Sequence, residues 1–181
     1  MTKRIWLSSP HMGGNELKYI QDAFEKNWIA PLGENVNGFE RDLANYSGIK
    51  GVSALSSGTA ALHLALVLLD VRKDDEILVS SFTFSASVNP IIYQGATPIL
   101  IDSEWETWNM DPELMEKAIK ERISMGRKPK AIIVVHLYGM PARMDQILET
   151  AGKYEIPVIE DAAEALGSRY KNRPLGTFGL M

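Results

Sequence analysis

The chain has 181 residues, of which 45% are hydrophobic and 23% charged, a balance typical of a folded globular protein of one domain or slightly more. Its formal net charge of −4 argues against the basic surface that binds nucleic acid or an anionic membrane. Because the chain has no cysteine, disulfides, zinc–thiolate sites and a cysteine nucleophile are excluded. No apolar run reaches the roughly 20 residues of a membrane span, and we expect a cytoplasmic protein.

Residues 1–50 are predicted to be an amino-terminal helical segment. Apolar side chains at helical spacing predict helices over 13–26 and 34–47, the second ending at Gly48. The connection between them contains Trp28 and Ile29, which could contribute to a substrate pocket. A buried contact between the two helices is the simpler interpretation of the tryptophan.

Residues 51–181 alternate between short apolar runs and helical patterns. The predicted strands are 52–55, 76–80, 97–102, 131–136 and 158–161, and the predicted helices are 58–69, 85–93, 111–124 and 145–155. Uninterrupted β-branched runs between helices indicate an α/β fold in three layers, with a mostly parallel sheet covered on both faces. The helix over 58–69 is apolar on nearly all sides, so we expect it to be buried.

The sequence Ser-Ser-Gly-Thr at 56–59 joins the first predicted strand to its helix. Gly58 would let the backbone approach a ligand closely, while Ser57 and Thr59 offer hydroxyl groups beside the free amides of the first helical turn. This combination predicts a phosphate site. An ordinary helix cap by either hydroxyl explains the same residues, and both interpretations stay open.

The carboxyl ends of the predicted strands also carry an aromatic residue, an imidazole and carboxylates, at Phe84, His136, Asp102 and Asp161. Ligands of open parallel sheets bind at this edge. Neither the glycine pattern of dinucleotide-binding enzymes nor a P-loop is present, which disfavours both classes.

A flat, phosphorylated, aromatic cofactor fits these residues better. Its phosphate would bind at 58–59, its ring would lie against Phe84, and Asp161 would reach the ring nitrogen. Pyridoxal phosphate has these three parts, and a carboxylate beside its nitrogen favours the protonated, electron-withdrawing ring. Alternatively, Asp161 caps the following helix or binds a metal ion.

Four blocks of the chain resemble, in order, the DegT/DnrJ/EryC1/StrS family of pyridoxal-phosphate-dependent nucleotide-sugar aminotransferases. They are 56–63, 81–86, 135–139 and 159–167. Residues 28–33 and 107–112 resemble the branch that aminates 4-keto-6-deoxy sugars for bacterial glycans and exopolysaccharide. The resemblance implies a type I transferase large domain over 51–181. It also implies transfer of an amino group from glutamate, through pyridoxamine phosphate, to a keto nucleotide sugar.

The resemblance also assigns roles to single residues. It implies phosphate contacts at 58–59, ring stacking by Phe84 and a nitrogen partner at Asp161. Glu164 stands where the family usually has glutamine or histidine near the ring hydroxyl. An ionised carboxylate cannot donate a hydrogen bond, so Glu164 would accept one or bind a substrate amine. His136 either lies near the far face of the ring or is a core histidine with partners of its own.

Two parts of the family pattern are expected beyond Met181, namely the catalytic lysine that binds the cofactor covalently and a small carboxyl-terminal domain. The cofactor-binding domain is therefore expected to be incomplete, and the 181 residues alone to catalyse poorly. The family implies a homodimer for the complete protein, and no metal site is expected. A sugar dehydratase of the same fold and a non-catalytic fragment that binds cofactor or ligand are the competing interpretations.

Overall fold

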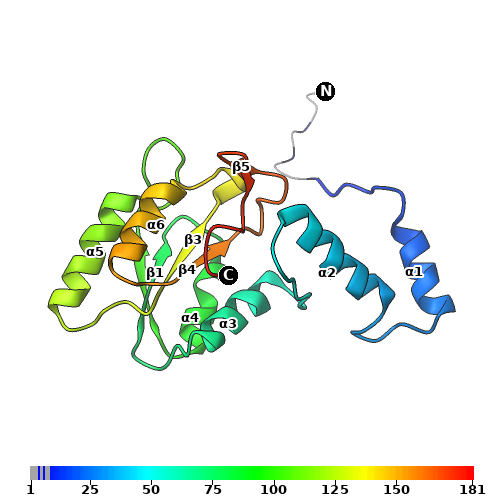
Figure 1. Ribbon diagram of the computed structural model, residues 1–181, viewed down its shortest axis with the longest axis horizontal. Helices are drawn as coiled ribbons and strands as arrows, with labels where there is room; N and C mark the ends of the chain where they lie inside the picture. The colour runs from blue at the N-terminus through cyan, green and yellow to red at the C-terminus, as the bar shows by residue number, and fades with distance from the viewer. Residues whose placement is uncertain (1–3, 5, 7–8) are drawn as a thin grey trace. The chain divides into compact units, whose positions relative to one another are not determined.

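The computed structural model describes residues 4, 6 and 9–181 (Figure 1). The chain divides into two compact units, Met1–Ala54 and Leu55–Met181. Within the described residues, none of the helices combines the length and the apolar character that crossing a bilayer requires.

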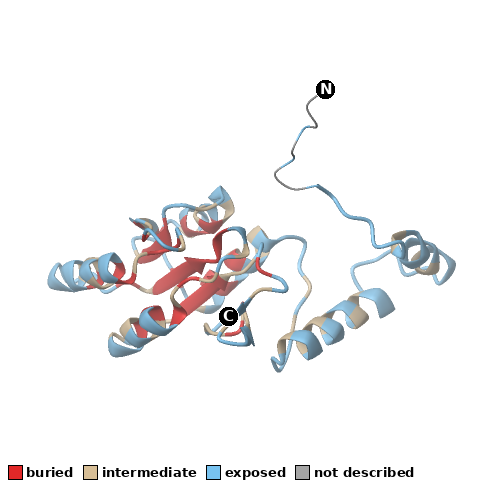
Figure 2. Cartoon of the chain, turned by 90° about the horizontal axis from the view of Figure 1, so that it is seen from above, coloured by how far each residue is buried: buried red, intermediate tan, exposed pale blue. Residues whose placement is uncertain are grey.

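The first unit contains the helices α1 (Glu16–Glu25) and α2 (Glu34–Ser47). The second helix ends as predicted, because Gly48 adopts a left-handed conformation with φ of 73°. Neither helix has a buried residue (Figure 2), and Trp28 keeps 49% of its surface exposed. The interpretation of Trp28 as a buried interhelix residue was therefore wrong, because these two helices enclose no core of their own.

The second unit is built on a four-stranded parallel sheet with the order β2-β1-β3-β4. Its strands are β1 (Glu76–Ser80), β2 (Thr97–Ile101), β3 (Ala131–Val135) and β4 (Val158–Asp161). Every residue of the two inner strands, β1 and β3, is buried. The continuous apolar runs thus form central strands covered on both faces, as the sequence predicts.

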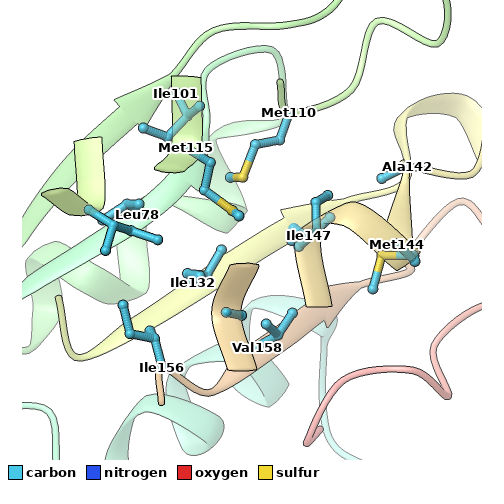
Figure 3. Close-up of a cluster of buried hydrophobic side chains, with 13 residues drawn as sticks. Leu78, Ile101, Met110, Met115, Ile132, Ala142, Met144, Ile147, Ile156 and Val158 are labelled. Atoms are coloured by element: carbon cyan, nitrogen blue, oxygen red, sulfur yellow. The ribbon is translucent and has the colours of Figure 1, made fainter. Parts of the chain in front are cut away.

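Helices cover both faces of this sheet and complete three layers. They are α3 (Gly58–Leu68), α4 (Asn89–Tyr93), α5 (Pro112–Ser124) and α6 (Met144–Lys153). Successive side chains of a strand point to opposite faces, so Val158 joins the core under α5 and α6 (Figure 3), whereas Ile159 joins the core under α3 and α4. The same alternation separates the next two residues of β4, Glu160 and Asp161.

The predicted helix over 85–93 is broken in two. A 3-10 turn, η1 (Ser85–Ser87), precedes α4, and Pro90 lies in the first turn of that helix. Proline has no N–H group and its ring clashes with the preceding turn, so a continuous helix cannot pass through it, although a first helical turn accepts it.

The predicted strand over 52–55 is also absent, since the described residues between 51 and 57 form no strand. A strand is stabilised by hydrogen bonds to a neighbour, and none of the strands of the described sheet pairs with this segment.

The prediction that the helix over 58–69 is buried on nearly all sides was wrong as well. Only one face of α3 meets the sheet, with Leu62, Ala65 and Leu66 buried. The opposite face exposes Leu64, Val67 and Leu68. An apolar composition indicates that a helix can be buried, but the packed layers decide how much of it is.

Candidate active site

A pocket of about 340 Å³ lies at the carboxyl ends of β3 and β4, beside the segment that follows β1. Four residues predicted from the sequence share its wall, namely Phe84, His136, Asp161 and Glu164. The predicted phosphate segment, 57–59, does not line this pocket. The helix that it begins, α3, packs beside both η1 and β4.

The aromatic residue and the carboxylate of this pocket differ in how they are held. Phe84 precedes η1 and leaves 80% of its surface exposed, so one ring face is available to a flat ligand. Asp161 ends β4, where the Ser87 hydroxyl donates a hydrogen bond of 2.6 Å to its Oδ2 atom. The Ala163 N–H lies 3.3 Å from Oδ1. The pocket thus combines an exposed aromatic ring with a carboxylate that hydrogen bonds hold in place.

The amino end of α3 is capped and open. The Ser57 side chain accepts a hydrogen bond of 3.1 Å from the Ala60 N–H, which confirms it as the helix cap. A methyl group placed on Gly58 would meet no heavy atom within 4 Å. The space at the Cβ position of Gly58 is therefore free of other parts of the described chain.

His136 is fully buried and both of its ring nitrogens have partners. Its Nδ1 atom accepts a hydrogen bond of 3.2 Å from the Ala142 N–H, and its Nε2 atom lies 2.9 Å from Glu160 Oε2. Since Nδ1 accepts, the proton of the neutral ring is on Nε2, which donates to the carboxylate. The structure thus shows a core histidine with its own partners, which leaves neither ring nitrogen free for a ligand.

Glu160 is a buried carboxylate that the sequence reasoning missed. Besides the His136 ring, it accepts hydrogen bonds from the backbone N–H groups of Gly176, Phe178 and Gly179. Burial by itself raises the pKa of Glu160, but the donors from His136, Gly179 and Gly176 outweigh it and hold the pKa below its usual value. A charged residue inside an apolar strand is the sequence signal that could have identified it.

Glu164 supports a turn of the pocket wall. Its Oε2 atom accepts a hydrogen bond of 2.7 Å from the N–H of Tyr138, which has a left-handed conformation with φ of 50°. Tyr138 belongs to the 3-10 turn η2 (Leu137–Gly139). A non-glycine residue in this conformation is strained, and the Glu164 hydrogen bond helps to hold it there.

The predicted substrate residues lie in the other compact unit. Trp28 lines a small hollow of about 30 Å³, and Ile29 keeps 65% of its surface exposed. In the part of the chain that the structure describes, no group of three or more His, Asp or Glu side chains could hold a metal ion.

Residues 10–181 match the model of the DegT/DnrJ/EryC1/StrS aminotransferase family. The chain belongs to this family. Aminotransferases of the DegT/DnrJ/EryC1/StrS family use pyridoxal phosphate, and PLP forms are among the solved structures of similar fold.

Among curated proteins, the chain is 54% identical over 179 residues to a putative pyridoxal phosphate-dependent aminotransferase, EpsN, of Bacillus subtilis. It is 42% identical over 176 residues to a GDP-perosamine synthase of Caulobacter vibrioides. These alignments cover 99% and 97% of the chain but 46% of each relative. The chain thus spans about half the length of the curated relatives it matches.

Solved structures of similar proteins agree with this fold. A putative sugar aminotransferase of Streptococcus pneumoniae, Spr1654, in its PMP form, matches 98% of the chain and 47% of its own length, with a TM-score of 0.88 and 32% identity. A GDP-4-keto-6-deoxymannose-3-dehydratase matches 98% of the chain and 46% of its own length, with a TM-score of 0.86 and 30% identity. The α/β fold predicted from the sequence is confirmed.

Proposed function

We propose that the complete protein is a pyridoxal-phosphate-dependent aminotransferase that moves an amino group from glutamate to a 4-keto-6-deoxy nucleotide sugar, in polysaccharide or glycan biosynthesis. The observation that carries this proposal is the meeting of Phe84 and Asp161 at one pocket, in a chain of this family. The relative named GDP-perosamine synthase supports an amino-sugar nucleotide as the product class.

The residues present fit the cofactor. Phe84 offers an exposed ring face for stacking, and Asp161 is a positioned carboxylate at the same pocket. The capped amino end of α3 offers backbone amides to a phosphate, with open space at Gly58. We assign the phosphate to 57–59 and the cofactor-binding part of the protein to residues 51–181.

In this proposal each side chain has one task. Phe84 orients the ring and excludes water from one face, while Asp161 keeps the ring nitrogen protonated by charge attraction. When bound, the cofactor withdraws electrons from the carbon that carries the amine. Glu164 and His136 hold the pocket wall through hydrogen bonds to the chain itself.

Binding of pyridoxamine phosphate to the 181-residue chain, followed by fluorescence, tests the site. Saturable binding that is lost in Asp161→Ala supports it, and equal binding by the two proteins contradicts it.

Reduction with borohydride after incubation with pyridoxal phosphate tests whether the catalytic lysine lies elsewhere. No lysine lines the pocket within the described residues, so we expect no single modified lysine in residues 1–181.

The second candidate function is sugar dehydration, and the similarity to the dehydratase structure is the observation that supports it. An assay of the complete protein distinguishes dehydration from amination. Incubation of a GDP-4-keto-6-deoxy sugar with glutamate should yield an amino sugar and 2-oxoglutarate. Loss of a hydroxyl group without retained nitrogen would establish the dehydratase.

We also propose that the complete protein is a homodimer. Light scattering after size-exclusion chromatography measures its mass directly.

A further inference from the structure

A buried hydroxyl group lies behind the candidate pocket. Ser87 ends the 3-10 turn η1, and none of its surface is exposed. Its Oγ atom lies 2.6 Å from Asp161 Oδ2 and 2.6 Å from Thr83 Oγ1. The serine and the aspartate are 74 positions apart in the sequence, so this contact exists only in the folded chain.

The direction of these two hydrogen bonds follows from the chemistry of the groups. An ionised carboxylate can only accept, so the Ser87 hydroxyl donates to Asp161. Its single proton is then used, and the short contact with Thr83 requires the threonine hydroxyl to donate to Ser87. The carbonyl oxygen of Phe84 is the more distant alternative for that proton, at 3.3 Å. Thr83 therefore donates to Ser87, and Ser87 donates to Asp161. We call this chain of two hydrogen bonds the relay.

The relay leaves the two oxygens of Asp161 unequal. Oδ2 is held by the buried serine, whereas Oδ1 has only the longer contact with the Ala163 N–H. A hydrogen bond to one oxygen restricts the rotation of the carboxylate and thus the direction of the other oxygen. Thr83 and Ser87 also flank Phe84 in sequence, so the segment that presents the aromatic ring also orients the acid.

We propose that Ser87, supported by Thr83, is a positioning residue that orients Asp161 so that Oδ1 meets the nitrogen of the cofactor ring. This inference rests on the proposed function. It concerns how the carboxylate is aimed, and Ser87 itself does not line the pocket. An alternative role for Ser87 is to satisfy a buried polar turn without influence on the ligand.

The test compares Ser87→Ala and Thr83→Val with the unchanged 181-residue chain, using pyridoxamine phosphate as the probe. Ser85→Ala is the matched control, because Ser85 is exposed on the same short turn. We expect Ser87→Ala to weaken binding by about tenfold, because a carboxylate that is no longer held by Ser87 would lose part of its aligned contact with the ring nitrogen. Thr83→Val should weaken it by about two- to threefold, and Ser85→Ala should leave it unchanged.

The second measurement is the absorbance of the bound probe as a function of pH, which reports deprotonation of its ring nitrogen. In the unchanged chain the midpoint should lie above that of free pyridoxamine phosphate, because Asp161 stabilises the protonated ring. In Ser87→Ala a misdirected carboxylate should move the midpoint down toward the free value. An unchanged or raised midpoint would overturn the positioning role, because a serine that only satisfies the turn would not lower it.

The two proposals fail in different ways. If the unchanged chain binds no probe, or if Asp161→Ala binds as well as the unchanged chain, the cofactor site assigned to this pocket and the relay are both overturned. If Asp161→Ala loses binding but Ser87→Ala keeps both the affinity and the midpoint, the relay alone is overturned. Circular dichroism confirms folding of each variant. If Ser87→Ala does not fold, the pH midpoint of Thr83→Val decides the matter, because Thr83 lines the pocket and a change in affinity alone could come from direct contact with the probe.

Discussion

Asp161 and Phe84 reach the same pocket by different physical routes. Asp161 is placed by the pleat of β4 and by a buried hydrogen bond, whereas Phe84 is placed by a backbone segment and remains largely exposed. A residue whose side chain meets few protein atoms can be changed at little cost in folding, so substitution of Phe84 should separate ligand binding from stability.

Asp161→Asn should reduce the affinity for pyridoxamine phosphate by roughly 10- to 100-fold, because it removes a charge while keeping the shape and the hydrogen bond from Ser87. Titration followed by probe fluorescence measures this change. Asp102→Asn is the control, since Asp102 also follows a strand but does not line the pocket. Equal losses in the two variants would refute a specific role for Asp161.

Phe84→Ala should weaken binding of the same probe by about tenfold through loss of stacking. Because the side chain is exposed, the free energy of unfolding should change by at most about 0.5 kcal/mol in urea. Trp105→Ala removes an aromatic side chain that is 88% exposed but lies away from this pocket, and it should leave binding unchanged. Unaltered binding in Phe84→Ala would exclude ring stacking at this residue.

At the scale of elements, two helices begin with side-chain caps but differ in surroundings. Ser57 caps α3, and Asp111 caps α5 by accepting hydrogen bonds from the N–H groups of Glu113 and Leu114. Only α3 begins at the predicted phosphate segment. The two caps therefore form a matched pair for separating helix stability from anion binding.

Ser57→Ala and Asp111→Ala should each lower the free energy of unfolding by about 1 kcal/mol, because each leaves first-turn amides without a partner. Only the Ser57 variant should also weaken binding of pyridoxamine phosphate. Binding of pyridoxamine, which lacks the phosphate, is measured as the reference, so that the contribution of the phosphate can be separated. A similar loss of binding in both variants would show that the effect comes from lower stability, and it would contradict a phosphate site at the amino end of α3.

At the scale of the whole molecule, Glu160 connects segments that are distant in sequence. Its carboxylate joins β4 to His136 at the end of β3 and to the backbone of 176–179. These groups are buried or half-buried, so their hydrogen bonds have little competition from water. The carboxylate therefore stabilises the strand end that carries Asp161.

Glu160→Gln should lower the free energy of unfolding by about 3–5 kcal/mol, because an amide presents its own N–H groups to N–H donors of the backbone. Urea denaturation measures this loss. Glu116→Gln is the control, since Glu116 pairs with Lys120 and Lys153 on the surface and should cost at most about 1 kcal/mol. Equal costs for the buried Glu160 and the partly exposed Glu116 would contradict the assigned role.

The same carboxylate should make stability depend on pH. A folded-state pKa below the usual value of 4.5 stabilises the fold above that pH, and the stabilisation is lost as the pH falls through the folded-state value. Denaturation midpoints measured between about pH 6 and pH 3 should therefore fall less steeply in Glu160→Gln than in the unchanged chain. An identical pH dependence in both proteins would show that Glu160 is not ionised in the fold.

Local patterns in the sequence determined much of this protein. Continuous β-branched runs predicted the strands, and helical spacing with Gly48 predicted the end of α2. Turn chemistry offered Ser57 or Thr59 as the cap of α3, and the structure shows that it is Ser57. These signals are local because each depends on neighbours within a few residues. The ends of parallel strands share one edge, so the order of elements was enough to predict that Phe84 and Asp161 lie close together.

Only the tertiary structure decided which side chains become partners. Ser87 reaches Asp161, Glu160 collects donors from 176–179, one face of α3 stays exposed, and 52–55 has no strand beside it. These outcomes depend on which layers pack together across the sheet, and no short-range period encodes such contacts. The sequence thus determined most of the helices and strands and the edge of the sheet where the candidate cofactor residues lie. Packing determined which hydrogen bonds hold the carboxylates at that edge.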